Sequence, residues 1–173
     1  MYMPEAASAG IAVIPVRGLI TLRADFWSDL FGGSGINRLQ KAFRAAMADQ
    51  GIKAIVFDID SPGGTVDGVF EFCDEIYEAK GRGTKQVYAV ANTFAASAAY
   101  CIAASCDKVI GMPSGQVGSI GVYSIHKDIS RMLEEAGITV TIIKAGAHKV
   151  EDSPLEPLAD DARKHLQAGV DEA

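Results

Sequence analysis

Two apolar segments separated by a helical pattern restrict what this chain can fold into. The segments "KAIVFDID" (53–60) and "QVYAVAN" (86–92) are nearly continuous apolar runs, which is typical of strands buried on both faces. Apolar residues between them recur at the spacing of one helix face, and Gly81 ends the pattern. These residues are Val66, Val69, Phe70, Cys73, Ile76 and Tyr77. Strand, helix and strand in this order predict an α/β fold with a parallel sheet and right-handed crossovers.

The remaining segments continue this alternation. We predict further strands at 11–20, 108–112, 115–122 and 140–145, and helices at 36–50, 126–136 and 159–168. The segment "EDSPLEPL" (151–158) holds two prolines and is predicted to be irregular. Because no internal repeat or linker is visible, we expect one domain over residues 1–173, with a flexible segment at 1–9.

Composition excludes several functional classes. At 173 residues and 49% hydrophobic, the chain is long enough for one domain with its own core. A net charge of -6 without a Lys/Arg cluster argues against nucleic-acid binding. The three cysteines, Cys73, Cys101 and Cys106, form no CxxC pair, and we expect reduced thiols in a cytoplasmic protein. No signal peptide and no membrane segment are predicted.

A candidate nucleophile stands in "NTFAASAAYCIAAS" (92–105). Ser97 lies between Ala95 and Ala99, after a predicted strand and at the start of a predicted helix. Nucleophilic serines on sharp strand-to-helix turns need small residues two positions to either side, as in G-x-S-x-G. The alternative is that alanines allow close helix packing and that Ser97 caps the helix. The segment alone favours the alternative.

The segment "SPGG" (61–64) changes that balance. It follows a buried strand, and the backbone N–H groups of Gly63 and Gly64 could stabilise an oxyanion. An ordinary glycine turn is the alternative. A base is less evident from the residues, because His126, His148 and His165 lie in no catalytic motif. Lys144 and Lys149 also remain candidates, since a lysine can accept a proton once burial lowers its pKa.

Four motifs together resemble the signal peptide peptidase A family of serine proteases. They are "DIDSPGG", "ASAAY.IAAS.D", "GSIGV" and "AGAHKVEDSPLEPL", and the resemblance spans about residues 10–168. Within that family the chain is most similar to the phage head-maturation (capsid) proteases. The resemblance implies a ClpP/crotonase-like fold, with a parallel sheet core and flanking helices, and a serine–lysine endopeptidase without cofactor or metal.

The resemblance also implies a role for individual residues. Ser97 corresponds to the nucleophile, Lys149 to the general base, and Ser119 to a serine that orients the lysine amine. The oxyanion hole would be formed by backbone amides of the "SPGG" segment, Gly64 with Gly63 beside it, and of Ala98. The expected substrate is a polypeptide such as a scaffold or capsid precursor, cut in the host cytoplasm or the phage prohead. The expected assembly is a homo-oligomeric ring.

Two departures from the family pattern leave alternative functions open. Ser-Ala-Ala stands where many relatives have Ser-Gly-Gly, and the family's C-terminal helix and strand are expected to be missing after "AGVDEA". A catalytically incomplete scaffold protein is therefore one alternative. A crotonase-type acyl-CoA enzyme is the other, although no glutamate stands out as its acid/base.

Overall fold

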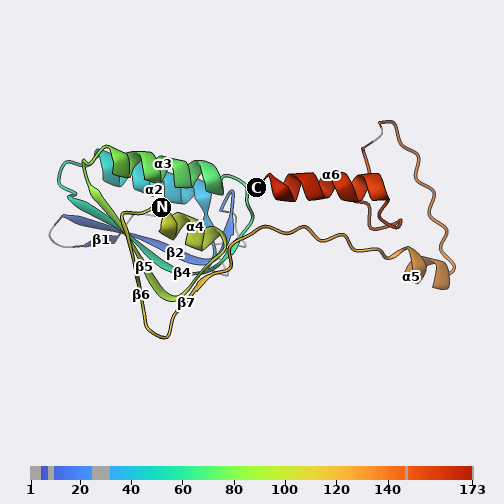
Figure 1. Cartoon of the computed structure of the whole chain (residues 1–173), viewed down its shortest axis with the longest axis horizontal. Helices are drawn as coiled ribbons and strands as arrows, with labels where there is room; N and C mark the ends of the chain where they lie inside the picture. The colour runs from blue at the N-terminus through green and yellow to red at the C-terminus, as the bar shows by residue number, and fades with distance from the viewer. Residues whose placement is uncertain (1–4, 8–9, 25–31, 147, 173) are drawn as a thin grey trace. The chain divides into compact units, whose positions relative to one another are not determined.

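The computed structural model describes residues 5–7, 10–24, 32–146 and 148–172. They divide into two compact units, one ending at Ile120 and the other beginning at Gly121 (Figure 1). Each unit is described by itself below. The expectation of a single domain stays a prediction. Within the N-terminal segment, Glu5–Ala7 forms a strand, β1, and residues 1–4 and 8–9 lie outside the described part of the chain.

The first unit is built on one sheet with the order β1-β2-β4-β5-β6. The central strands β2 (Ile11–Thr21), β4 (Ala54–Gly64) and β5 (Gln86–Ala96) are parallel, as the alternation of strands and helices predicts. The short strands at its margins are β6 (Lys108–Gly111), β3 (Ser34–Gly35), paired with β2, and β7 (Gln116–Gly118), paired with β5. Strand β1 is antiparallel to β2.

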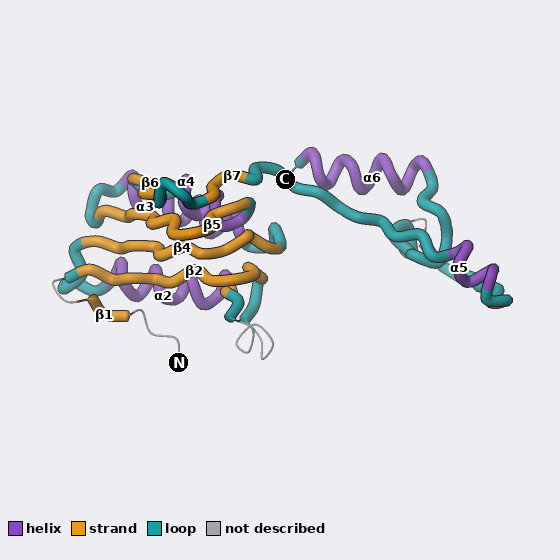
Figure 2. The backbone as a smooth tube through the Cα atoms, turned by 90° about the horizontal axis from the view of Figure 1, so that it is seen from below, coloured by secondary structure: helices purple, strands orange, loops and turns teal. Residues whose placement is uncertain are grey.

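Three helices cover one face of this sheet. They are α2 (Ile36–Ala48), α3 (Val69–Gly81) and α4 (Ala98–Ala104), and Figure 2 looks onto the opposite face. The core lies between the helices and the sheet, where the rings of Phe43, Phe57 and Phe72 meet with centroids 5.8 to 6.0 Å apart. The core is therefore formed by only one face of each strand, although the sequence pattern indicated strands buried on both faces.

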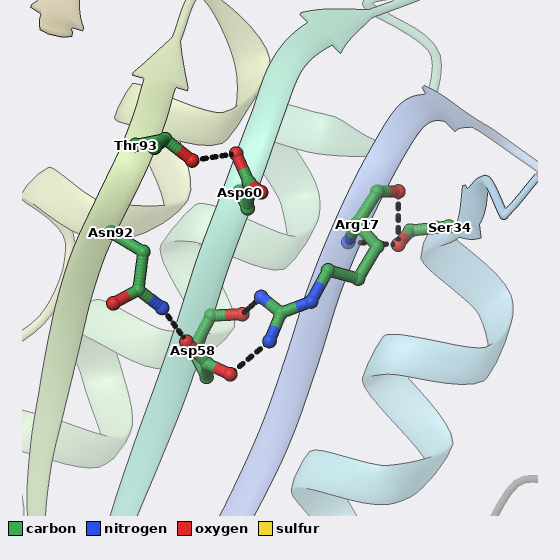
Figure 3. Close-up of polar contacts among 6 residues, drawn as sticks. All are labelled: Arg17, Ser34, Asp58, Asp60, Asn92 and Thr93. Carbon is green, nitrogen blue, oxygen red and sulfur yellow. Dashed lines mark hydrogen bonds and ion pairs between the residues drawn. The ribbon is translucent and has the colours of Figure 1, made fainter. Parts of the chain in front are cut away.

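Polar side chains link the central strands on the opposite face (Figure 3). Arg17 on β2 donates from Nη1 to the backbone carbonyl of Asp58 on β4 at 2.6 Å, and its Nη2 contacts the Asp58 carboxylate. Asn92 on β5 donates to the other carboxylate oxygen. Asp58 thus connects three strands near their midpoints, before the chain reaches their C-terminal ends. Beside it, the Thr93 hydroxyl donates to Asp60 at 2.6 Å.

Both β2 and β4 are irregular near those ends. The register shifts between Arg17 and Leu19 on β2, and between Ile59 and Ser61 on β4. The fully buried Ser61 joins the two irregularities, since its hydroxyl donates to the Gly18 carbonyl at 2.6 Å and accepts the Gly63 N–H at 3.1 Å. A single hydroxyl therefore satisfies two backbone groups where the regular ladder is interrupted.

The ends of several elements differ from the sequence prediction. "SPGG" belongs to β4, and α3 begins only at Val69, after Gly68 with φ 74°. Strand β5 runs on to Ala96, because Phe94–Ala96 pair with β7 and Ala95 pairs with Ser61. Strand β7 ends at Gly118, well before residue 122. Pairing with neighbours that are distant in sequence extends a strand beyond its local pattern.

The second unit contains α5 (Ser130–Glu135) and α6 (Asp160–Asp171). Helix α5 is shorter than the predicted 126–136, because the Asp128 carboxylate accepts the Ser130 N–H at 2.9 Å and thereby marks the helix start. The predicted strand at 140–145 is wrong. A strand requires a paired neighbour, and the described residues of this unit supply none.

We predict that Ser61→Ala destabilises the first unit. The variant leaves the Gly18 carbonyl and the Gly63 N–H without this partner in a buried place, which costs about 1–3 kcal/mol. Urea denaturation followed by circular dichroism measures the free energy of unfolding. The exposed Ser114→Ala is the matched control and should change it by less than about 0.5 kcal/mol. Equal values for the two variants would contradict the role of Ser61.

Candidate active site

Ser97 stands on a sharp turn between β5 and α4, as predicted. Its backbone has φ 54° and ψ -125°, a conformation that costs a non-glycine residue about 1–3 kcal/mol. The turn is held on both sides, because the Ser97 N–H donates to the Gly118 carbonyl at 2.8 Å and the Ser97 carbonyl accepts the Cys101 N–H at 3.0 Å. The Ser97 side chain makes no capping hydrogen bond to α4. The geometry favours the nucleophile interpretation over the helix-cap alternative.

The "SPGG" segment lies directly against this turn. Gly63 has φ +96°, and a Cβ on it would lie 2.7 Å from Ser97 Cβ and from the Ala96 carbonyl oxygen, and 3.0 Å from the Ala98 nitrogen. Real Cβ atoms do not approach other atoms so closely. Glycine is therefore required at 63 both by its φ angle and by the space that Ser97 occupies. The two motifs, more than thirty residues apart in the sequence, meet at the C-terminal ends of adjacent strands.

The two glycines of "SPGG" differ in their surroundings. The N–H of Gly63 donates to the Ser61 hydroxyl, so this predicted oxyanion donor already has a partner. Gly64 is exposed and packs closely against β2, where a Cβ would overlap the Ile20 carbonyl. Thr65, the next residue, donates to that same carbonyl at 3.0 Å. The oxyanion role of both glycines stays a prediction.

Ser119 shares an unusual backbone conformation with Ser97. Among the non-glycine residues in the described ranges, only these two have a positive φ, and both values are 54°. Ser119 is exposed and directly follows Gly118, which pairs with Ala96. The two serines therefore come directly after paired residues of neighbouring strands. The structure brings Ser97, Ser119, Gly63 and Ala98 together in the first unit.

Lys149 belongs to the second unit and is exposed there, as is Lys144. Its turn is attached to the preceding segment by two contacts. His126 lies 3.2 Å from Asp152 through Nδ1, and the Ile129 N–H donates to the Pro154 carbonyl at 2.8 Å. Since a carboxylate can only accept, Nδ1 of His126 carries the proton.

Of the other two histidines, His148 lies at this turn and His165 lies on α6. His148, next to Lys149, contacts Glu151, and its ring stacks on that of His165 with centroids 5.6 Å apart. His126 and His148 thus contact two acidic residues of the turn that carries Lys149. The side chain of His126 is only 10% exposed, and its buried Nε2 has no hydrogen-bond partner among the described residues. The pairing of Lys149 with Ser97 stays a prediction.

The described residues contain no group of three or more His, Cys, Asp or Glu side chains that could hold a metal ion. No helix in the described ranges is long and apolar enough to cross a bilayer.

Sequence reasoning did not find two residues that shape the site. In the sequence, Ser61 stands out only as part of "SPGG" and Gly118 only as part of "GSIGV". Ser61 sets the irregular end of β4, and the Gly118 carbonyl holds the Ser97 N–H. A buried serine before Pro-Gly-Gly is the one signal in the sequence that could have indicated the first. No signal in the sequence indicates the role of Gly118, because that role depends on β7 lying beside β5.

We predict that Gly63→Ala is strongly destabilising because the new Cβ meets backbone atoms on two sides. Gly83→Ala is the matched control, since Gly83 also has a positive φ of +62° but nothing lies within 4 Å of an added Cβ. We expect a loss of about 1 kcal/mol for Gly83→Ala and about 3 kcal/mol or more for Gly63→Ala. Thermal and urea unfolding compare the two variants, and similar losses would show that Gly63 does not abut Ser97.

The sequence and the fold both have known counterparts. A family model described as "Peptidase family S49" matches residues 79–173, more than half of the chain. The chain is 36% identical over 164 residues to the "Head-tail preconnector protein GP5" of Enterobacteria phage P21, covering 95% of this chain and 32% of that protein. It is 35% identical to the "Capsid assembly protease C" of Escherichia phage lambda, covering 94% of this chain and 36% of that protein.

Among solved structures, an enoyl-CoA hydratase/isomerase family member superimposes with a TM-score of 0.50 at 13% identity, covering 79% of this chain and 53% of that one. This likeness confirms the predicted crotonase-like fold and nothing beyond the fold. The chain spans about a third of the length of the curated relatives it matches. The predicted resemblance to phage head-maturation proteases is confirmed, and the chain belongs to peptidase family S49.

Proposed function

We propose that this chain is the catalytic part of a serine endopeptidase in which Ser97 attacks the substrate peptide bond and Lys149 is the general base. One observation carries the proposal. Ser97 occupies a strained turn at the end of a central strand, and Gly63 leaves no side chain between that turn and the adjacent strand. Strained backbone of this kind is concentrated at catalytic sites, and membership of a peptidase family agrees with it.

The proposed reaction is acyl transfer to the Ser97 hydroxyl. Neutral Lys149 takes the hydroxyl proton as Ser97 attacks the carbonyl carbon, and it then protonates the leaving amine. Water hydrolyses the acyl-enzyme in a second step. Ser119 orients the lysine amine, in keeping with its place beside Gly118, whose carbonyl holds the Ser97 turn.

The oxyanion is assigned to the backbone amides of Gly64 and Ala98. Gly63 has a different part in this proposal, because its N–H is engaged by Ser61 and its missing Cβ makes room for Ser97. Each backbone donor in an oxyanion hole is worth about 3–4 kcal/mol in the transition state. The Ser61 hydroxyl supports the site by fixing the end of β4.

Lys149 must lose its proton before it can act. An amine in water has a pKa of about 10.4, so the base has to be covered in the assembled enzyme. The proposal therefore requires the turn that carries Lys149 to meet the Ser97 turn, within one chain or between neighbouring subunits of a homo-oligomeric ring. The contacts of His126 and His148 around Lys149 would hold that turn in shape when it is covered.

The proposed substrate is a polypeptide of an assembling phage head, a scaffold or capsid precursor. The names of the two phage relatives support this substrate class. Cleavage would then take place in the prohead or in the cytoplasm of the host.

We predict that Ser97→Ala and Lys149→Ala each reduce cleavage of an unfolded protein substrate by at least about 1,000-fold. Both substitutions remove a group that the chemistry requires and leave the core unchanged. Lys144→Ala is the matched control for the base, and Ser114→Ala for the nucleophile. Release of labelled peptides measures the rate, and circular dichroism verifies folding.

A fluorophosphonate probe tests the same site without a substrate. We expect labelling at Ser97 that is lost in Lys149→Ala and kept in Lys144→Ala. If the assembled protein is not labelled at Ser97, or if Lys149→Ala retains full activity, the proposed dyad is wrong. The first outcome would instead support a scaffold protein with an incomplete site.

A further inference from the structure

Two cysteine thiols meet where α3 packs on α4. Cys73 lies on α3 and Cys101 on α4, and their sulfur atoms are 3.0 Å apart. Cys73 is buried, with 6% of its surface exposed, whereas Cys101 is partly buried. A disulfide needs the two sulfurs at about 2.05 Å, so they would have to approach each other by about 1 Å. The sequence separation of 28 residues gave no indication of this pair.

Their mutual contact makes the two thiols unequal. The hydrogen bond from Cys73 lowers the pKa of Cys101 to about 7, although burial and the Asp74 carboxylate both act in the opposite direction. The same hydrogen bond, together with burial, raises the pKa of Cys73, and a hydrogen bond with Ser105 opposes that rise. The contact therefore favours the thiolate on Cys101 and the protonated thiol on Cys73. A thiolate with a neighbouring thiol is the arrangement that reacts with disulfides.

We propose that Cys73 and Cys101 form a reversible oxidation site for small-molecule disulfides of the glutathione type, closing an internal disulfide between α3 and α4. The Cys101 thiolate attacks one sulfur of the reagent and expels a thiolate, which forms a mixed disulfide. Cys73 then gives up its proton and attacks the Cys101 sulfur, expelling the second reagent thiolate. In total, the two protein thiols lose two electrons and form one disulfide, and the reagent gains these electrons and becomes two thiols.

The proposed disulfide would restrain α4, the helix that begins next to Ser97. Cys101 lies in the first turn of α4, and its N–H donates to the Ser97 carbonyl at 3.0 Å. A Cys73–Cys101 disulfide would therefore tie the element that follows the Ser97 turn to α3. Because it closes a loop of about thirty residues in the unfolded chain, it should raise the melting temperature by about 5 °C or more.

Cys106 provides the internal control. It is buried, its thiol lies 3.4 Å from the Ile102 carbonyl, and burial raises its pKa to about 12. It should not react under conditions that oxidise the other pair. Cys106→Ser should form the same disulfide at a rate within about twofold of the unchanged chain.

The experiment incubates the reduced chain with oxidised glutathione and follows intact mass and free thiols. We expect two of the three thiols to disappear, and peptide mapping to join Cys73 to Cys101. The rate should rise with pH and level off at a lower pH than for an ordinary thiol, because the contact with Cys73 lowers the pKa of Cys101. Cys73→Ala should stop at a mixed disulfide on Cys101.

The result does not depend on proteolysis. Ser97→Ala should form the disulfide at the rate of the unchanged chain, so failure of the proposed protease mechanism and failure of this proposal are distinguishable. Persistence of all three thiols would overturn the proposal. A linkage that involves Cys106, or one that joins two chains, would overturn it as well.

Discussion

The contact between Gly63 and the Ser97 turn is the constraint on which the site depends. The two segments approach so closely that residue 63 can carry no side chain at the point of contact. The alanines around Ser97 follow from the same crowding, since Ala95, Ala96 and Ala98 are buried against the sheet and its helices. The small-residue stretch is therefore explained by the close packing of the start of α4, and it also suits the nucleophile role that we propose for Ser97.

The polar contacts of the sheet hold this crowded edge in place. Asp58 connects the three central strands (Figure 3). Three residues further along β4, Ser61 bonds to the irregular part of β2 and to Gly63. Parallel strands place their C-terminal ends at one edge, where ligands bind in folds of this class. Each departure from a regular ladder here is compensated by a side chain, which is how backbone strain persists in a stable core.

The two units are stabilised very differently. Aromatic and aliphatic side chains fill the first between sheet and helices, whereas among the described residues of the second only Ala162 is a buried apolar residue. Hydrogen bonds and ion pairs of the histidines shape the turn that holds Lys149 instead. In the proposed mechanism, the surroundings of Lys149 are set by the part of the protein that covers it. The Ser97 turn, in contrast, is complete within the first unit. The dyad we propose thus joins one element that is preorganised and one that assembly must enclose.

The amino-acid sequence by itself determined the parallel α/β class and the helices α2 and α3, because apolar periodicity and glycine punctuation are local signals. Its motifs, through their resemblance to known proteases, indicated the family and the position of the Ser97 turn. It did not determine how far β4 and β5 extend, or that 140–145 is not a strand. It also did not indicate the hydrogen bonds made by Ser61 and Gly118, or the contact between the thiols of Cys73 and Cys101. Those features arise from contacts between residues far apart in the chain. Only the tertiary structure decides them, since a backbone group or a thiol acquires its partner when the sheet and its helices have packed.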